Sequence, residues 1–253
     1  MSIRTALSAA LLFVATVAQA QSAKDHIAMG DRERAANNLS ASLSHYEAAV
    51  KAEPGNYEAL WKASRDAVEL GEFDASAERR TALYRSAEQY ARQAVKANPG
   101  DAEGHFSLAR ALGRAALTLG KQERVKYAGE VHDQALQALK ANPRHGGALH
   151  VMGVWNAEIM RLSGFSRFMA KNVLGGKTFG EANWKDAVRY MEAAVAAEPS
   201  KITHHLDLAA VYEDMGNKAK ARTEYEWIAK APPIEYNDKH YQRLAAERAA
   251  KLR

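Results

Sequence analysis

The sequence contains no cysteine among its 253 residues. This absence excludes disulfides, thiolate catalysis and cysteine-ligated zinc. Prolines are few, six in all, and aromatic residues make up only 8% of the chain. Alanine and the other good helix formers are abundant instead, and these residues lose little conformational freedom on entering a helix. The composition therefore predicts an all-α protein.

The sequence also lacks a concentration of charge of one sign. Its formal net charge is +5, and the acidic and basic residues are interspersed. Nucleic-acid binding needs a clustered basic face, so we expect no nucleic-acid partner. No Gly-x-Ser-x-Gly elbow, phosphate-binding loop or dinucleotide fingerprint is present. We therefore expect a non-enzymatic protein that needs no cofactor.

The nine histidines form no familiar metal-binding motif. His204 and His205 are adjacent and close to Asp207, and His145 and His150 form a second group, but neither has the His-Glu-x-x-His spacing of a zinc site. Adjacent residues of a helix point about 100° apart. We expect these histidines to be solvated or to cap helices, and we expect no metal site.

The first twenty residues differ from the rest of the chain. Arg4 precedes an uncharged, mostly apolar run over residues 6–18, and Ala18-Gln19-Ala20 fits the cleavage pattern of a signal peptide. The run is too short to span a bilayer comfortably. We expect residues 1–20 to be an export signal cleaved after Ala20, with the mature chain periplasmic or secreted. An uncleaved anchor or a mitochondrial presequence is the alternative.

A proline-terminated amphipathic segment recurs along the chain. The segment that ends in Ala-Val-Lys-Ala-Glu-Pro54 returns before Pro99, Pro143 and Pro199, with a weaker copy before Pro233. Each copy is predicted to be a helix that ends at its proline, because proline lacks an N–H and clashes with the preceding turn.

The tetratricopeptide repeat (TPR) is a helix-turn-helix of about 34 residues with small residues at its helix crossing. With every proline placed at repeat position 32, position 8 is small in each copy: Gly30, Ser64, Ala109, Gly153 and Ala209. The sequence therefore predicts an all-α, TPR-like right-handed superhelical solenoid of about five helix-turn-helix repeats. We expect it to occupy residues 21–253 as one domain.

The prolines stand 45, 44, 56 and 34 residues apart, so three intervals exceed the standard repeat. The extra residues of the first two intervals come close to three helical turns and predict longer helices. The third interval holds an insert over residues 161–184. Residues 239–252 are predicted to form a final helix, capped by Asn237-Asp238, that covers the last apolar face as solenoids require.

Four segments resemble the regulator of microtubule dynamics family over roughly residues 35–252. They are Leu60-Trp61-Lys-Ala-Ser-Arg65, His150-Val-Met-Gly-Val-Trp155, Phe165-Ser-Arg-Phe-Met-Ala-Lys171 and Ala187-Val-Arg-Tyr-Met-Glu192. The resemblance implies a TPR-like helical domain without enzymatic activity. Animal members of the family associate with microtubules and organelle contacts, and some of their TPR domains are linked to lipids. The resemblance therefore also implies these partners and a cytoplasmic or cytoskeletal location.

The first helices of successive TPRs line a concave groove. Residues four apart share a helix face, so Trp61 is predicted to lie over Arg65 and Phe106 over Arg110. Arginine binds carboxylates and phosphates bidentately, and aromatic side chains add contact area. We predict that this groove binds an acidic peptide or protein segment, or an anionic lipid head group. The predicted groove residues are Trp61, Arg65, Phe106, Arg110, Arg114 and His150.

Another interpretation of the same residues is structural. Trp61 and Phe106 would then belong to the core, and the arginines would pair with Glu58, Glu69 or Glu103.

The insert is a second candidate site, because it carries cations and aromatic residues and no acid between Arg161 and Gly180. A basic amphipathic helix can lie on an anionic membrane or bind a partner. The alternative is a helix whose apolar face packs onto the repeat stack. The candidate residues are Arg161, Phe165, Arg167, Phe168 and Lys171.

Overall fold

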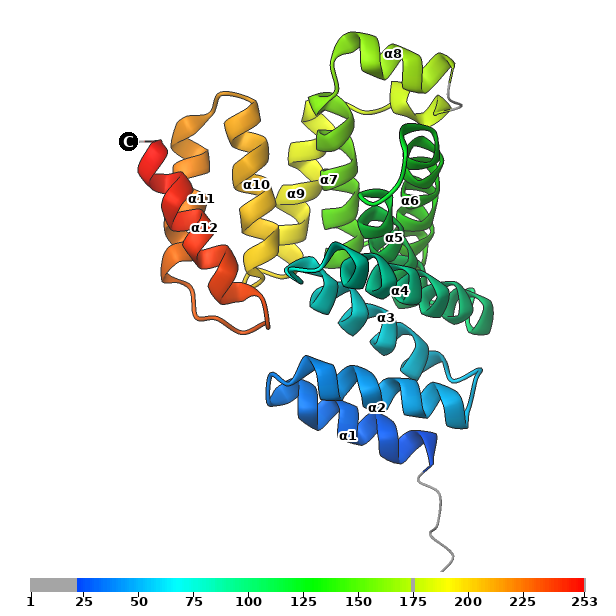
Figure 1. The fold of residues 1–253 in the computed structure, drawn as a ribbon. Helices are drawn as coiled ribbons and strands as arrows, with labels where there is room; N and C mark the ends of the chain where they lie inside the picture. The colour runs from blue at the N-terminus through cyan, green and yellow to red at the C-terminus, as the bar shows by residue number, and fades with distance from the viewer. Residues whose placement is uncertain (1–21, 174–175, 253) are drawn as a thin grey trace, which may run out of the picture.

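The computed structural model describes residues 22–173 and 176–252, so the export signal predicted over residues 1–20 lies outside the described residues. Within these ranges the chain forms twelve α-helices and one short 3-10 helix, and it contains no strand (Figure 1). None of the described helices combines the length and the apolar character that crossing a membrane requires.

Ten of the helices form five pairs in chain order, and this confirms the predicted TPR-like solenoid of about five repeats (Figure 1). The pairs are α1 (Ala23–Ala35) with α2 (Leu39–Ala52), α3 (Tyr57–Glu72) with α4 (Ala77–Ala97), α5 (Ala102–Ala116) with α6 (Lys121–Ala141), α7 (Gly146–Arg161) with α9 (Trp184–Ala197), and α10 (Ile202–Asp214) with α11 (Lys218–Lys230). The insert holds α8 (Gly164–Asn172) and the 3-10 helix η1 (Lys177–Gly180), and α12 (Asp238–Lys251) ends the chain.

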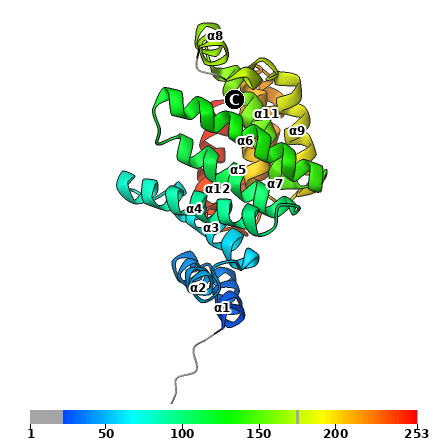
Figure 2. The same cartoon turned by 90° about the vertical axis from the view of Figure 1, so that its right-hand side faces the viewer.

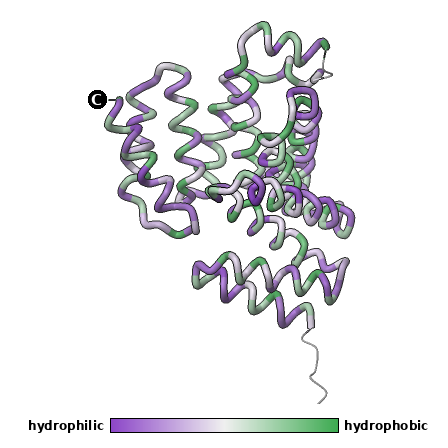
Figure 3. Tube along the Cα trace, viewed as in Figure 1, coloured by the Kyte–Doolittle hydropathy of each residue, from purple (hydrophilic) through white to green (hydrophobic). Residues whose placement is uncertain are grey.

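The first helices of the repeats form a continuous inner layer. Helix α1 contacts α3, α3 contacts α5, α5 contacts α7, α7 contacts α10, and α10 contacts α12. Figure 2 shows the first helix pair at one end of the molecule, with the other pairs stacked above it. In Figure 3, hydrophobic and hydrophilic residues alternate along the helices, as expected for helices that bury one face.

The prolines set the ends of the second helices, as predicted. The residue before each of the first four prolines has a φ between −141° and −135°, which is extended backbone. Steric clash with the proline ring favours this conformation over the helical one. The extra residues of the second and third repeats lengthen the second helices, because α4 and α6 have 21 residues each and α2 has 14.

The small residues at repeat position 8 are all buried and allow the two helices of a repeat to approach closely. A Cβ atom added to Gly30 would lie 2.5 Å from Cε1 of Tyr46, and one added to Gly153 would lie 2.7 Å from Cγ of Met191. Tyr46 and Met191 are themselves fully buried, so they have little space into which to retreat.

We expect the substitution Gly30→Leu to lower the free energy of unfolding by about 1–3 kcal/mol, because it overpacks the contact with Tyr46. Gly113, inside α5, has no atom within 4 Å of an added Cβ. The matched substitution Gly113→Leu should therefore raise the free energy of unfolding by about 0.5–1 kcal/mol through helix propensity. Urea unfolding followed by circular dichroism measures both effects. A stabilising effect of Gly30→Leu would contradict this account of the helix crossing.

Helix α12 covers the final repeat by packing on α10 and α11, with Tyr241 and Ala245 buried. Asn237 occupies the N-cap position of α12, as predicted, but its side chain makes no capping hydrogen bond to the helix. A carboxylate oxygen of Asp238 instead accepts the backbone N–H groups of Ile234 and Glu235, at 2.8 and 2.6 Å. Asp238 therefore fixes the loop before the helix.

The start of α12 also contacts the end of α3, so the C-terminal helix meets the second repeat. The Asn237 side-chain amide donates a hydrogen bond of 3.1 Å to the backbone carbonyl of Glu69. The ring centroid of Phe73, the residue after α3, lies 3.8 Å from that of His240 and 5.5 Å from that of Tyr241. These contacts link the second repeat to the C-terminal helix.

Candidate functional site

The predicted groove arginines lie on α3 and α5, two neighbouring helices of the inner layer. Trp61 is half-buried, and the guanidinium carbon of Arg65 lies 5.2 Å from its ring centroid. The predicted placement of Trp61 over Arg65 is therefore confirmed. This aromatic–guanidinium pair forms one part of the candidate site.

Three acids on α3 hold the three predicted arginines. Arg65 Nε lies 2.9 Å from an Asp66 carboxylate oxygen, Arg110 lies 3.3 Å from Glu69, and Arg114 pairs with Glu72. The expectation that an arginine pairs with Glu69 is thus confirmed for Arg110. The other two acids proposed as partners are engaged elsewhere, Glu58 with Lys62 and Glu103 with His145.

Sequence reasoning missed a fourth arginine of this network. Arg34, in the last turn of α1, pairs with Asp66 at 2.6 Å and with Glu69 at 3.0 Å. The spacing of the three acids along α3, at intervals of three residues, was a signal that they share a face toward neighbouring helices. The network therefore holds four arginines against three carboxylates and carries one excess positive charge.

The carboxylates lie beneath the arginines. Asp66 is fully buried, and the side chains of Glu69 and Glu72 are 8% exposed, whereas the four arginine side chains are 20–36% exposed. Burial raises the pKa of Glu69, but the charges of Arg110, Arg34 and Arg65 outweigh burial and hold it below its usual value. Glu69 is thus ionised at neutral pH, and the solvent meets mainly guanidinium groups.

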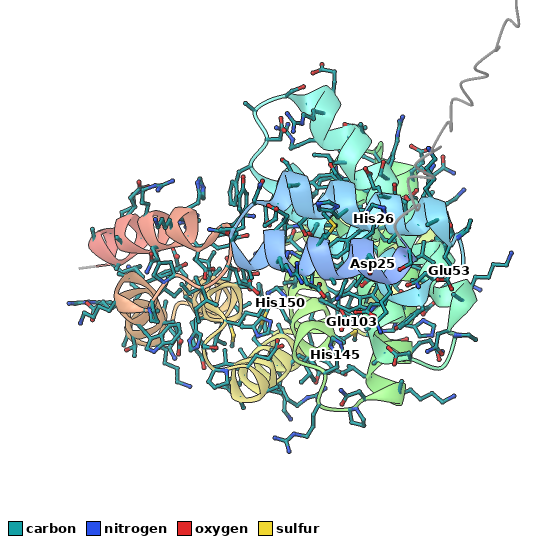
Figure 4. The ribbon with its side chains drawn as sticks, turned by 90° about the horizontal axis from the view of Figure 1, so that it is seen from below. Asp25, His26, Glu53, Glu103, His145 and His150 are labelled. Atoms are coloured by element: carbon teal, nitrogen blue, oxygen red, sulfur yellow. The ribbon has the colours of Figure 1, made fainter. Side chains whose placement is uncertain are left out.

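His150 lies on the inner layer beside α10, as the view from below in Figure 4 shows. Its Nε2 atom lies 2.8 Å from an Asp207 carboxylate oxygen. Burial raises the pKa of Asp207, but the hydrogen bond with His150 and the charges of His150, Arg114 and Arg161 outweigh burial. The pKa of Asp207 therefore lies below its usual value. His150 therefore links α7 to α10 through the Asp207 carboxylate.

Phe106 contacts the next repeat. Its ring centroid is 4.8 Å from that of His145, and a Cβ added to Gly147 would lie 2.5 Å from the ring. Phe106 and Arg110 lie four residues apart on α5, and the predicted shared surface of the two residues stays a prediction. Phe106 is half-buried and fits the alternative interpretation as a packing residue.

The histidines are more deeply placed than expected. His145 caps α7 by accepting the N–H of Ala148, which confirms the capping interpretation for this residue, and it faces Glu103 at 3.2 Å (Figure 4). His204 and His205 are buried, so the solvated interpretation is wrong for them. Burial lowers the pKa of His204 to about 2. Over residues 22–173 and 176–252, no group of three or more His, Asp or Glu side chains is arranged to hold a metal ion.

The insert presents its aromatic residues to the solvent. Phe165 is 75% exposed and Phe168 is 59% exposed, whereas Ala170 is buried. The alternative in which these rings pack onto the repeat stack is therefore wrong. Arg161 belongs to the last turn of α7 and pairs with Asp214 and Glu158, so it is not part of the insert helix.

A hollow of about 450 Å³ lies between α8 and η1. It is lined by Met160, Gly164, Arg167, Phe168, Lys171, Asn172, Phe179, Gly180 and Ala182.

These features define the chain as a TPR-like helical solenoid, a class of interaction scaffold. A sequence model of regulator of microtubule dynamics protein 1–3 matches residues 18–253, and the chain belongs to this family.

The chain is similar to regulator of microtubule dynamics protein 1 of Bos taurus, with 26% identity over 197 residues that cover 75% of this chain and 60% of that protein. The Homo sapiens protein of the same name is 26% identical over 192 residues, which cover 74% of this chain and 59% of its own length. The chain thus spans about 60% of the curated relatives it matches.

Among solved structures, the chain is similar to a thermophilic TPR protein of Thermus thermophilus. The TM-score is 0.63 at 20% identity, and the match covers 89% of this chain and 99% of that one. This likeness shows the fold.

Proposed function

We propose that the chain is a non-enzymatic scaffold that binds an acidic peptide or protein segment on its inner layer. One observation carries the proposal: the four arginine side chains of the α1–α3–α5 network are 20–36% exposed, whereas the side chains of the three carboxylates that hold them are at most 8% exposed. Such an arrangement fixes the guanidinium groups in place before a ligand arrives. Preorganised arginines bind carboxylates at a reduced entropic cost.

The lining of the inner layer favours a peptide over a lipid there. A lipid bound on this layer would need an apolar channel for its acyl chains, and ion pairs line this part of the surface. Trp61 supplies a flat apolar surface beside the arginines, which suits a mixed acidic and hydrophobic segment.

We further propose that the scaffold acts in the periplasm or outside the cell. The proposal rests on the export signal expected at residues 1–20. The names of the relatives suggest microtubules as a partner, and a cytoplasmic or cytoskeletal location would go with that partner. An exported chain would not meet microtubules, so we do not extend that partner to it.

Isothermal titration with a short peptide of alternating glutamate and leucine tests the peptide site. Arg65→Gln and Arg110→Gln should each weaken binding about tenfold or more, because a charge-assisted hydrogen bond contributes about 1.5–3 kcal/mol. Trp61→Ala should also weaken binding, and it leaves every ion pair of the network intact, so it remains informative if an arginine variant loses stability.

The control for the titration is Arg92→Gln. Arg92 also forms ion pairs, with Glu88 and Glu130, but on the second helices α4 and α6. The Arg92→Gln variant should bind the acidic peptide with the affinity of the unaltered chain. A peptide with lysine in place of glutamate should not bind. Unchanged affinity in folded Arg65, Arg110 and Trp61 variants, or absence of binding by the unaltered chain, would contradict the proposed site.

A further inference from the structure

Two cations beside the hollow between α8 and η1 have no carboxylate partner among the described residues. Arg167 contacts the sulfur of Met160 at 2.8 Å, a weak acceptor. The Lys171 ammonium lies over Gly180, 2.6 Å from the position of an added Cβ. Most arginines of the inner layer, by contrast, are held by acids. Two cations without a carboxylate partner, beside a hollow lined in part by Phe168 and Phe179, fit an anionic, amphiphilic ligand.

The same segment also exposes apolar side chains. Phe165 and Phe168 stand one helical turn apart on α8, and Val173, which follows the helix, is 60% exposed. Figure 1 shows α8 at one edge of the solenoid, beyond the ends of α6 and α7. Because it projects there, a flat surface can reach α8 without obstruction from the repeats.

We propose that α8 docks the chain on the surface of an anionic phospholipid bilayer. Phe165 and Phe168 enter the boundary between head groups and acyl chains, as the apolar face of an interfacial helix does. Arg167 and Lys171 bind lipid phosphates, and the hollow accepts part of one head group. The charge pattern matches this occupant, since the segment from 162 to 180 has three cations and no acid.

A bilayer fits this face better than a protein partner does. A nine-residue helix is about 14 Å long, and its exposed side is too small for the roughly 1,000 Å² that a stable protein interface buries. A membrane has no such requirement, because exposed aromatics and cations each add independently to the binding free energy. This site is separate from the arginine surface on α3 and α5, so either proposal can fail alone.

Co-sedimentation of the chain with vesicles tests the proposal. Binding to vesicles of phosphatidylcholine and phosphatidylglycerol should exceed binding to pure phosphatidylcholine, and added salt should weaken it. The double variants Phe165→Ser/Phe168→Ser and Arg167→Glu/Lys171→Glu should each reduce the partition coefficient about tenfold or more, since burying a large apolar side chain contributes about 1.5–3 kcal/mol and each basic residue about 1 kcal/mol.

Two matched controls lie away from the insert. Met215→Ser/Ile234→Ser removes two exposed apolar side chains, and Arg85→Glu/Lys239→Glu reverses two exposed cations. Neither should change vesicle binding by more than about twofold. The proposal is overturned if the chain does not bind the anionic vesicles, if the insert variants bind as well as the controls, or if sedimentation velocity shows a self-association that the phenylalanine variant abolishes.

Discussion

Replacing Asp66 by alanine is expected to lower the free energy of unfolding by about 3–5 kcal/mol, because it breaks a buried ion-pair network and leaves charges without a partner. Asp66 is fully buried and receives the Arg34 guanidinium at 2.6 Å, the Arg65 guanidinium at 2.9 Å and the Ser42 hydroxyl at 2.6 Å. Its removal therefore releases side chains from α1, α2 and α3 together. The urea midpoint of the circular dichroism signal measures the effect.

The control for this prediction is Asp133→Ala on α6. The Asp133 side chain is 70% exposed and lies 3.4 Å from His132, so the substitution should change the free energy of unfolding by no more than about 0.5 kcal/mol. Similar losses in both variants would show that the inner-layer network does not organise the first two repeats.

Replacing Tyr241 by alanine should lower the free energy of unfolding by about 3–5 kcal/mol, as large aromatic truncations in cores do. The Tyr241 ring is buried, contacts Phe73 edge-on, and joins α12 to the end of α3. Burial and the nearby charge of Glu72 raise its pKa well above the usual value, so it is neutral. The substitution therefore removes an apolar contact from the place where α12 meets the end of α3.

Tyr236→Ala is the matched control, since Tyr236 lies five residues earlier and is 44% exposed. It should change the free energy of unfolding by about 0.5 kcal/mol or less. Thermal unfolding followed by circular dichroism compares the two variants. A Tyr241 variant as stable as the Tyr236 variant would mean that contact between α12 and α3 contributes nothing to the fold.

Most of the fold could be predicted from the sequence, because a repeat protein is specified locally. Each second helix ends at a proline for a steric reason that acts within a few residues. Each helix crossing needs a small residue, and the contact of Gly30 with Tyr46 shows why. Five copies of the same constraints were enough to place ten helices and the lengthening of α4 and α6.

The contact between α12 and the second repeat could not be predicted in this way. The hydrogen bond from Asn237 to Glu69 joins residues 168 positions apart in the chain. Whether α12 reaches the second repeat depends on small rotations that accumulate from repeat to repeat, and single helix lengths do not determine these rotations. The prediction of Asn237 as a helix cap used local propensity alone, and the distant carbonyl of Glu69 provided another partner.

The candidate site was predicted in part. The neighbours Trp61 and Arg65 share one helix, so their spacing was sufficient. The partners of Arg110 and Arg114 lie on another helix, and Arg34 comes from a third. To identify which acids pair with these arginines, one must know how α1, α3 and α5 are placed relative to one another. Residue spacing within one helix does not give this placement.

Photo-crosslinking tests the central claim, that the inner layer of the solenoid is its binding surface, most directly. The probe is the glutamate–leucine peptide with a photoreactive phenylalanine analogue, and mass spectrometry identifies the crosslinked residues of the chain. The account predicts crosslinks on α3 and α5 near Trp61 and Arg110, and their loss in the Trp61→Ala variant. Crosslinks confined to the second helices α4, α6 and α9 would contradict it.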